Sequence, residues 1–538
     1  MEKHYATIWE SIADVIGDRD ALVHGENRKT WSEYDERAAR LAQAMSEAGL
    51  KPGAKVGLYV YNSNEYLEAQ YATMKFRGVP ININYRYLDD ELLYLLENSD
   101  AEALFFHSSL SDRVARIMDR APKVRLWIQI DDGGPLLPGA VEYEELVRAH
   151  SPAARIKRSE EDLYMLYTGG TTGMPKGVMY DTGAMVQFFM SLGFPILGLG
   201  LPEPQDVAKT VKSACEEGVN IASIPGCPLM HGTGMWLGAM MPSLAGGKIV
   251  TLTNRSFDGE ELWKTAEREG ASQLVIVGDA FAKPMLLALE AARERGESYD
   301  LSKIRFLISS GVMWTTEVKE ALLEWNDWML IDAMGSTEGS MGTQITTRGN
   351  LGETARFSKG EHTKVFTEDG REVEPGSGES GMVAAGGTVP LGYYKDEAKS
   401  AATFKTIGGI RYSFPGDWAI VEADGTLTLL GRGSNCINTA GEKVYPEEVE
   451  EAVKQHPDVI DCLVVGVDDE KFGQRVTGVA SLQEGSAADH DAIRQFTKTK
   501  LAAYKVPKQI LIVDRVKRAP NGKADYVWAR EQVEGALS

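Results

Sequence analysis

Cysteine is scarce in this sequence, with only four among 538 residues. Their spacing matches neither a zinc site nor a disulfide-stapled domain, so we interpret all of them as reduced thiols: Cys215, Cys227, Cys436 and Cys462. Long apolar runs are also absent, because no segment approaches the roughly 18 residues that a transmembrane helix needs. Residues 1–10 lack the apolar core and the cleavage site of a signal peptide. These absences predict a cytoplasmic protein without a membrane span.

The chain also has fewer positively than negatively charged residues. It has 57 Lys and Arg against 78 Asp and Glu, a formal net charge of −21. This balance argues against a nucleic-acid partner and gives an anionic substrate no long-range attraction. A phosphate site would therefore have to be locally positive or to use Mg²⁺. The length exceeds what one core usually supports and predicts at least two domains.

Strand-like and helix-like segments alternate along most of the chain. This rhythm is typical of an α/β fold with a mainly parallel sheet that is covered by helices. The expected strands are 55–61, 79–84, 103–106, 124–130, 163–167, 249–252, 273–277 and 304–308. The expected helices are 32–48, 64–76, 89–98, 206–217, 258–269 and 283–294. Segment 194–222 carries no pattern that assigns it a role.

The composition changes at residues 431–434, a short turn-rich stretch of Gly-Arg-Gly-Ser. Beyond it, Pro446 and two acidic residues are typical of a helix start. The following pattern predicts a small α+β unit, with strands 459–467, 476–482 and 509–513 and a helix over about 488–501. The sequence therefore predicts a large domain over 1–430, a hinge at 431–434 and a smaller mobile domain over 435–538.

One stretch has a strong local signature. The apolar strand over 163–167 leads into Tyr-Thr-Gly-Gly-Thr-Thr-Gly-Met-Pro-Lys-Gly-Val at 167–178. Its glycines let backbone N–H groups approach an anion, its threonines add hydroxyl donors, and Lys176 adds a positive charge. A Walker A loop is excluded, because that motif needs Gly-Lys-Ser/Thr and here Pro175 precedes the lysine and Gly177 follows it. The stretch is either a phosphate-binding loop or a plain glycine-rich turn.

This stretch resembles the signature of the adenylate-forming enzymes, which include acyl-CoA synthetases, adenylation domains and luciferases. It departs from that signature in Gly169, where a serine is usual. Further motifs resemble those of the superfamily, in the same order, over about residues 30–526. They are Pro-Leu-Met-His-Gly at 228–232, Ser-Ser-Gly-Val-Met at 309–313, Met-Gly-Ser-Thr-Glu at 334–338, Tyr-Ser-Phe-Pro-Gly-Asp at 412–417, Gly-Arg-Gly-Ser at 431–434, Gly-Glu-Lys-Val-Tyr-Pro at 441–446 and Pro-Asn-Gly-Lys at 520–523.

The resemblance implies a site where a carboxylate attacks the α-phosphorus of ATP, so charge on the phosphoryl oxygens must be neutralised. Thr337 would donate to the α-phosphate and Glu338 would bind Mg²⁺. The β- and γ-phosphates would lie in the loop, against Thr168, Gly169, Gly170, Thr171 and Thr172, with Lys176 in support. The adenine would lie against Ser310, Gly311, Met334, Gly335 and Ser336, where Met334 replaces the usual tyrosine.

The resemblance also assigns residues on both sides of the hinge. Asp417 would accept hydrogen bonds from the ribose hydroxyls, and Arg432 would reach the ribose. Lys523 would bridge the carboxylate and the α-phosphate during attack. Rotation about Ser434 would then bring in the segment at 441–443, where Gly441 would open a tunnel for coenzyme A and Lys443 would contact its phosphates. Ser434 and Asn438 replace charged residues that are common in the superfamily, so a charge-based latch at the hinge is not expected.

The acid would occupy a pocket of small residues, with one histidine on the route between acyl group and thiol: His231, Gly232, Gly278, Asp279, Gly311 and Gly335. Small residues leave room for a medium-chain, long-chain or bulky steroid-like carboxylic acid. The look of the motifs is closest to fatty-acid and steroid side-chain CoA ligases. Each residue alone has an ordinary explanation: His231 in the core, Asp417 in a turn and Lys523 in solvent.

Three alternatives stay open on the sequence. An acid in the pocket, such as Asp279, could bind the amine of an amino acid, so an aryl or amino-acid adenylating enzyme is the main alternative. A luciferase-type oxygenase shares every motif. A nucleotide sensor without activity is expected to have lost Lys523 or Glu338, and both are present. The oligomeric state is also open, with a homodimer as one alternative.

Overall fold

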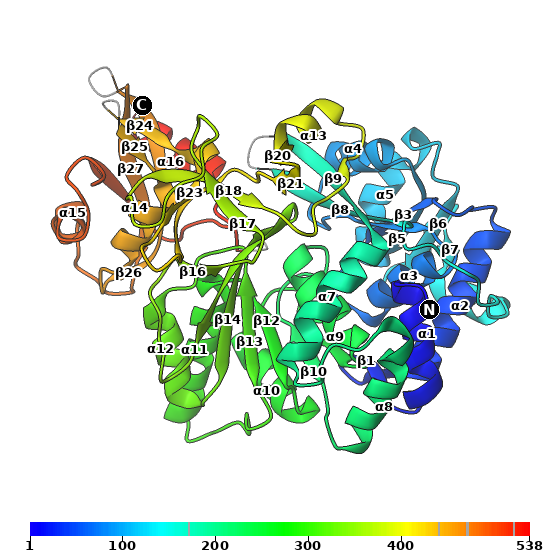
Figure 1. Ribbon diagram of the computed structural model, residues 1–538. Helices are drawn as coiled ribbons and strands as arrows, with labels where there is room; N and C mark the ends of the chain where they lie inside the picture. The colour runs from blue at the N-terminus through cyan, green and yellow to red at the C-terminus, as the bar shows by residue number, and fades with distance from the viewer. Residues whose placement is uncertain (171–172, 440–441, 470–472, 520–521, 538) are drawn as a thin grey trace.

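The computed structural model describes residues 1–170, 173–439, 442–469, 473–519 and 522–537. Figure 1 shows a large N-terminal part, coloured blue to yellow, and a smaller C-terminal part, coloured orange to red, which packs at one side of it. Within these described ranges, four sheets organise the two parts. In the described ranges no helix is long and apolar enough to cross a membrane.

The first sheet is parallel throughout and has the strand order β4-β3-β5-β6-β7. Its strands are β3 (Lys55–Tyr59), β4 (Val79–Asn82), β5 (Ala101–His107), β6 (Leu126–Ile130) and β7 (Val141–Glu142). The helices that connect and cover them are α3 (Asn64–Lys75), α4 (Asp89–Ser99), α5 (Ser111–Ile117) and α6 (Tyr143–Ala149). The predicted strands 55–61 and 79–84 and the predicted helix 64–76 are confirmed, and they form a βαβ unit in which β3 and β4 are parallel.

The second sheet begins parallel and becomes antiparallel. Its parallel strands are β1 (Asp20–His24), β10 (Ala222–Pro225), β11 (Lys248–Thr251), β12 (Gln273–Ile276), β13 (Phe306–Ser310) and β14 (Met329–Ser336), with β2 (Asn27–Thr30) antiparallel at the edge. The helices around this half are α1 (Tyr5–Ile16), α2 (Trp31–Glu47), α8 (Val207–Glu216), α9 (Met241–Leu244), α10 (Gly259–Glu269), α11 (Asp279–Glu294) and α12 (Thr316–Trp325). Helix α11 begins four residues before the expected start and continues through Pro284.

The antiparallel half of this sheet was not predicted. From β14 onward the chain folds back in hairpins. The strands are β15 (Gly339–Thr346), β16 (Arg356–Lys359), β17 (Thr363–Phe366), β18 (Ser380–Ala385), β20 (Phe404–Ile407), β21 (Ile410–Ser413), β22 (Asp417–Val421) and β23 (Leu427–Arg432), with helix α13 (Glu397–Thr403). Most antiparallel neighbours here are joined by turns, so the regular alternation of strand and helix that marks a parallel sheet is missing from this part of the sequence.

A third, antiparallel sheet has the order β19-β9-β8, formed by β8 (Leu163–Gly170), β9 (Gly173–Asp181) and β19 (Gly392–Tyr393). Helix α7 (Thr182–Ile196) follows β9 directly and was not predicted. The motif at 167–178 is thus the tip of the β8–β9 hairpin, and Thr171 and Thr172 lie outside the described residues.

The small C-terminal part has its own sheet and core. Its strands are β24 (Ile437–Thr439), β25 (Glu442–Val444), β26 (Val459–Asp469), β27 (Gly473–Leu482) and β28 (Gln509–Val513), and its helices are α14 (Pro446–Lys454), α15 (His490–Lys498) and α16 (Tyr526–Leu537). Strand β23 ends at Arg432 in the large sheet, and β24 begins at Ile437 in the small one. Helix α14 lies against β23, so the two parts are in contact where the chain crosses between them.

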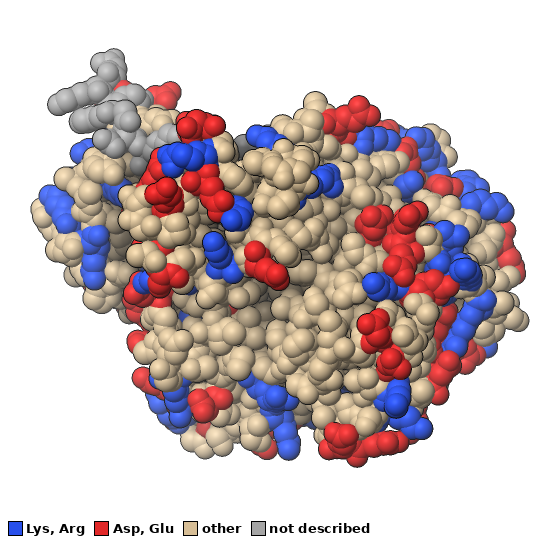
Figure 2. Space-filling model, in the orientation of Figure 1, with Lys and Arg blue, Asp and Glu red and all other residues tan. Residues whose placement is uncertain are grey.

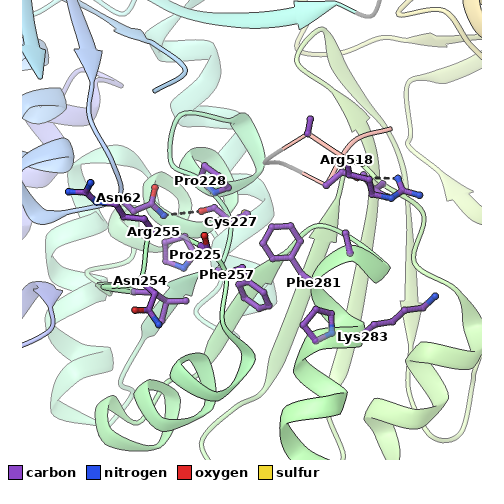
Figure 3. Close-up of a pocket in the computed structure, with 18 of the residues that line it drawn as sticks. Asn62, Pro225, Cys227, Pro228, Asn254, Arg255, Phe257, Phe281, Lys283 and Arg518 are labelled. Atoms are coloured by element: carbon purple, nitrogen blue, oxygen red, sulfur yellow. Dashed lines mark hydrogen bonds between the residues drawn. The ribbon is translucent and has the colours of Figure 1, made fainter. Parts of the chain in front are cut away.

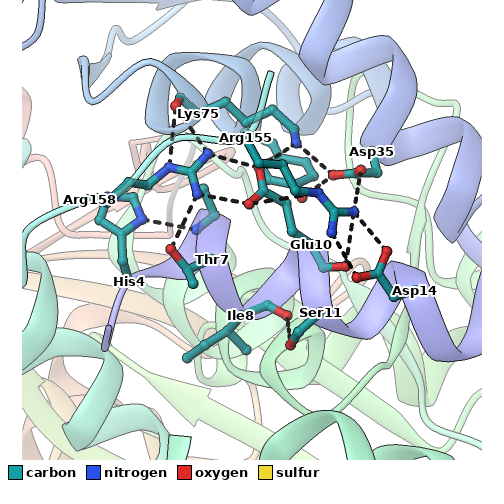
Figure 4. A network of polar contacts seen from close by, with 12 residues as sticks. His4, Thr7, Ile8, Glu10, Ser11, Asp14, Asp35, Lys75, Arg155 and Arg158 are labelled. Carbon is teal, nitrogen blue, oxygen red and sulfur yellow. Dashed lines mark hydrogen bonds and ion pairs between the residues drawn. The ribbon is translucent and has the colours of Figure 1, made fainter. Parts of the chain in front are cut away.

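A buried ionic network anchors the N-terminal helix (Figure 4). Arg158 donates to both carboxylate oxygens of Glu10 at 2.9 and 2.8 Å, and Lys75 donates to Glu10 at 2.9 Å. All three side chains are buried. Arg155 pairs with Asp14 at the exposed edge of the same network. On the face that Figure 2 shows, Lys and Arg are interspersed with Asp and Glu, so this face has no large patch of only positive or only negative charge.

Candidate active site

The hairpin tip is held from the neighbouring sheet. The Asn82 side chain accepts a hydrogen bond from the Tyr167 N–H at 2.6 Å and donates to the Tyr167 carbonyl at 2.8 Å. It also donates to the Met230 carbonyl at 2.7 Å. Asn82 therefore fixes the entry of the loop and joins it to the segment of His231. Thr168, Gly169 and Gly170 continue β8 into the tip, and Thr168 is paired with Lys176 across the hairpin.

The next motif forms the turn between β14 and β15. Ser336 pairs with Gly339, so Thr337 and Glu338 are the two turn residues. The Tyr180 hydroxyl donates to the Thr337 carbonyl at 2.9 Å. The Glu338 carboxylate accepts a hydrogen bond from the Tyr393 hydroxyl at 2.9 Å. Strand β9 and strand β19 thus hold this turn, one through its backbone and one through its carboxylate.

The β22–β23 register places Asp417 opposite Arg432. The Arg432 Nε lies 3.5 Å from the Asp417 Oδ1, while the Asp417 Oδ2 is buried and has no hydrogen-bond partner within the described ranges. Burial raises the pKa of Asp417, and the charge of Arg432 opposes that rise. A buried carboxylate oxygen without a donor is costly, so this atom marks a place for hydroxyl or N–H donors of a ligand.

Lys523 comes from the small C-terminal part and lines a cavity formed otherwise by the large one. The Lys523 side chain is exposed where it lines the cavity. Its pKa is lowered, first by partial desolvation and second by the nearby charge of Arg432, while Glu338 and Asp417 act in the opposite direction. A cation that lines a cavity and lies within electrostatic range of two carboxylates is suited to bind an anion in that cavity.

This cavity has a volume of about 520 Å³ and combines residues from most of the motifs. The predicted site residues in its lining are Thr168, His231, Gly232, Ser310, Gly311, Met334, Gly335, Ser336, Thr337 and Lys523. Asp417, Arg432 and Glu338 lie outside this lining but are coupled electrostatically to Lys523. Lys176 lies 3.8 Å from Asp396 and is likewise outside the lining. Gly441 and the side chains of Ser434 and Lys443 fall outside the described residues.

His231 lines the cavity with a buried Nε2 that has no hydrogen-bond partner among the described residues. Burial, with a smaller contribution from the positive charge of Lys523, lowers the pKa of His231 to about 3. The imidazole is therefore neutral at physiological pH. Next to it, Gly234 approaches a backbone so closely that an added Cβ would lie 2.4 Å from the Pro228 carbonyl oxygen.

Gly278 and Asp279, which were predicted to line the acyl pocket, are not part of the lining of this cavity. Gly278 has φ +52°, and an added Cβ would lie 2.3 Å from the Met313 carbonyl oxygen, so the position requires glycine. The Asp279 carboxylate accepts hydrogen bonds from the Thr315 N–H at 2.9 Å and the Thr315 hydroxyl at 3.0 Å. It also lies 3.7 Å from the Lys283 Nζ. Asp279 thus connects the first residue of α11 to Thr315, just before α12.

Sequence reasoning missed several residues of the cavity. Helix α7 contributes Gln187, Phe188 and Leu192 to its wall. Trp236, in the π-helix η4 (Thr233–Met240), also lines it, and its indole donates to the Tyr164 hydroxyl at 3.0 Å. The apolar composition of 182–196 is the one signal that could have indicated α7, but it cannot say which face meets a cavity.

A second cavity of about 820 Å³ lies between the two parts of the molecule (Figure 3). It shares Cys227 and Pro228 with the first cavity. Phe257 and Phe281 pack together in its wall at 4.7 Å between ring centroids. Basic side chains outnumber acidic ones in its lining, which includes Arg86, Arg255, Lys283, Lys454, Arg515, Lys517 and Arg518 against Asp132, Asp279 and Asp461. This cavity is locally positive although the chain is acidic.

No group of three or more His, Cys, Asp or Glu side chains that could hold a metal ion occurs in the described ranges. Mg²⁺ in nucleotide sites is commonly held by one or two carboxylates together with phosphate oxygens and waters. Glu338, with one oxygen bonded to Tyr393, fits that kind of site.

Comparison with known proteins agrees with this geometry. The family model described as AMP-binding enzyme matches residues 9–394, and the one described as AMP-binding enzyme C-terminal domain matches 448–523. A 3-oxocholest-4-en-26-oate–CoA ligase of Rhodococcus rhodochrous is 42% identical, covering 99% of this chain and 96% of that protein. A medium/long-chain-fatty-acid–CoA/3-oxocholest-4-en-26-oate–CoA ligase of Mycobacterium tuberculosis is 39% identical, covering 98% and 96%.

Solved structures share the fold. The anthranilate CoA ligase AuaEII, in complex with anthranoyl-AMP, superposes with a TM-score of 0.85 at 22% identity and covers 99% of this chain and 98% of its own. ATP-bound MatB from Rhodopseudomonas palustris superposes with a TM-score of 0.84 at 22% identity and covers all of both chains. By its sequence, its fold and the order of its motifs, this chain belongs to the AMP-binding enzyme family.

Proposed function

We propose that this protein is an AMP-forming acyl-CoA ligase, which converts a carboxylic acid, ATP and coenzyme A into acyl-CoA, AMP and pyrophosphate. One observation carries the proposal. Lys523, from the small part, reaches a cavity whose walls hold Thr168, Thr337 and His231. The conformation is therefore the one in which an acid could meet ATP.

In the first reaction, a carboxylate oxygen of the acid attacks the α-phosphorus. The bond from that phosphorus to the bridging oxygen of the β-phosphate breaks, and pyrophosphate leaves. The Lys523 ammonium would attract both anions, and Thr337 would donate to the α-phosphate. The loop at 168–172 would hold the β- and γ-phosphates, with Lys176 near its base. Mg²⁺ held by Glu338 would neutralise part of the phosphate charge.

The nucleoside would be held next to this centre. Ser310, Gly311, Met334, Gly335 and Ser336 would surround the adenine. Met334 is buried and supplies a polarisable thioether where an aromatic face is usual. The Asp417 Oδ2, which has no hydrogen-bond partner in the part of the chain that the structure describes, would accept a ribose hydroxyl, and the charge of Arg432 would favour the ionised carboxylate.

In the second reaction, the thiol sulfur of coenzyme A attacks the acyl carbon, AMP leaves, and the thiol proton is released. The second, positively charged cavity meets the first at Cys227 and Pro228 and would admit coenzyme A. A histidine with a pKa near 3 is too weak a base to take the thiol proton efficiently at neutral pH. His231 would therefore line the route as a neutral group.

A domain rotation would separate the two reactions. We assign the large domain to 1–430, the hinge to 431–434 and the mobile domain to 435–538. The chain passes from β23 to β24 at this point, so a change of backbone torsion near Ser434 would move α14, the segment at 441–443 and Lys523 together. Lys523 would then leave, and Gly441 and Lys443 would approach coenzyme A.

For the substrate, we propose a medium-chain, long-chain or steroid-like carboxylic acid. The relatives with about 40% identity are named as ligases of 3-oxocholest-4-en-26-oate and of medium- and long-chain fatty acids. The apolar side chains Phe188, Leu192 and Trp236 in the cavity wall support an apolar acyl group. The amino-acid alternative is disfavoured, because the Asp279 carboxylate is bonded to Thr315 and lies outside the cavity.

The test is pyrophosphate release over a panel of fatty, steroid, aromatic and amino acids, with and without coenzyme A. Fatty or steroid acids should release pyrophosphate and yield acyl-CoA, and Lys523→Ala should lose acyl-adenylate formation while it still transfers a supplied acyl-adenylate to coenzyme A. Adenylation at wild-type rate in Lys523→Ala, or release that never yields a CoA ester, would refute the proposal.

A further inference from the structure

Tyr393 lies outside every motif that the sequence revealed, yet it contacts the candidate metal ligand. Its hydroxyl donates to the Glu338 Oε1 at 2.9 Å, across 55 residues of chain. Its ring is buried and packs on Phe404, with 5.3 Å between the ring centroids. The ring is therefore held by packing, and the hydroxyl has a defined direction toward the turn at Thr337–Glu338.

The strand of Tyr393 is part of the same sheet as the phosphate loop. Strand β19 pairs with β9, with Tyr393 opposite Val178. The Leu391 N–H donates to the Met179 carbonyl at 2.7 Å, and the Tyr394 N–H donates to the Gly177 carbonyl at 2.8 Å. A shift of the hairpin that carries the loop therefore shifts Tyr393 with it.

Lys176, at the base of the loop, also contacts Tyr393. Its Nζ lies 5.7 Å from the ring centroid of Tyr393, within the range of a cation–π contact. Tyr180 on the same strand holds the Thr337 carbonyl. The turn is thus tied to the loop strand twice, by Tyr180 at its backbone and by Tyr393 at its carboxylate.

The Tyr393 hydroxyl occupies only one side of the Glu338 carboxylate. A tyrosine hydroxyl has one proton to donate, a carboxylate has two acceptor oxygens, and this hydrogen bond uses Oε1. The other oxygen of Glu338 stays available for a metal ion.

We propose that Tyr393 is a positioning residue: it orients the Glu338 carboxylate for Mg²⁺ and couples that carboxylate to the phosphate loop through β9. The inference rests on the proposed function, in which Glu338 binds the metal ion of MgATP. Removing a residue that hydrogen-bonds to a metal-binding side chain and orients it commonly lowers the metal affinity by roughly 10- to 100-fold.

The test is Tyr393→Phe, which keeps the ring and removes only the hydroxyl. ATP binding is measured by calorimetry in the full-length protein at a series of Mg²⁺ concentrations. We expect half-maximal enhancement of ATP binding to need about tenfold more Mg²⁺, with ATP binding in EDTA and the thermal unfolding temperature unchanged. Adenylation should recover at high Mg²⁺, which a merely structural defect would not do.

Tyr394→Phe is the matched control. Tyr394 is the next residue, and its hydroxyl also donates to a carboxylate, that of Asp100 at 2.7 Å. This variant should keep the wild-type Mg²⁺ dependence. An unchanged Mg²⁺ dependence in Tyr393→Phe, or an equal shift in Tyr394→Phe, would overturn the positioning role.

Glu338→Gln separates this inference from the proposed function. If Glu338→Gln leaves the Mg²⁺ dependence unchanged, the metal role of Glu338 fails, and the inference fails with it. If Glu338→Gln shifts the dependence and Tyr393→Phe does not, only the inference fails. If Tyr393 acts through Glu338, Tyr393→Phe adds nothing to the shift of Glu338→Gln, whereas additive shifts would show an independent effect.

Discussion

Replacement of Asp417 by asparagine is expected to separate ligand binding from folding. Asp417→Asn changes one oxygen to an amide and removes the negative charge, with almost no change of volume. In the protein without ATP, the Oδ2 of Asp417 is buried without a partner in the part of the chain that the structure describes. Such an atom costs roughly 1–3 kcal/mol. Arg432 loses its partner in the variant, but its side chain is 35% exposed, so water compensates for much of that loss.

These two effects oppose each other, so the free energy of unfolding should change by no more than about 1 kcal/mol. ATP binding should change much more. A hydrogen bond to a charged acceptor contributes about 1.5–3 kcal/mol, and asparagine offers a ribose one acceptor in place of two. At 1.4 kcal/mol for each factor of ten, the affinity for ATP should fall roughly 10- to 150-fold.

The assays are calorimetric ATP binding, the KM for ATP in pyrophosphate release, and urea unfolding without ligand. Asp424→Asn is the control, since Asp424 lies in the turn at the far end of the same strand pair and bonds Thr426 and Arg356. A wild-type ATP affinity in Asp417→Asn would refute the ribose assignment. A loss of stability of several kcal/mol would show that Asp417 supports the fold.

Two further predictions concern stability. Arg158→Met leaves the buried Glu10 without its bidentate partner and should lower the free energy of unfolding by about 3–5 kcal/mol in urea melts, whereas Arg155→Met at the exposed edge of that network should cost less than about 1 kcal/mol. A change of less than 1 kcal/mol in Arg158→Met would contradict the role of the network. The pKa of His231 is about 3 in the folded protein, against an ordinary value of 6.5. As the pH falls below 6.5, the unfolded chain therefore binds a proton at His231 before the folded protein does. The free energy of unfolding should decline between pH 6.5 and 3, by up to about 1.4 kcal/mol for each pH unit. The His231→Asn variant should lose that part of the pH slope between pH 6.5 and 5, and an unchanged slope would contradict the burial of a neutral imidazole.

Much of the fold follows from local pattern. Strands β3, β5 and β12 lie within or close to the predicted ranges, because buried parallel strands are short apolar runs that helices separate. Helix α8 lies within the predicted 206–217 for the same kind of reason. The antiparallel half of the second sheet could not be predicted in this way. Its hairpins have mixed exposure, and the pairing of β18 with β22 depends on contacts between distant residues.

The sequence by itself determined the family of this protein and the identity of the residues that carry its motifs. Local sequence is enough for this, since a glycine-rich loop after a strand can be recognised without knowing which residues lie near it in space. The tertiary structure decided which of these residues meet. It brought Lys523 into a cavity with Thr337 and His231, turned Asp279 away toward Thr315, and placed Tyr393 on Glu338. Each of these outcomes depends on the packing of segments that are far apart in the chain, and no local pattern encodes such a meeting.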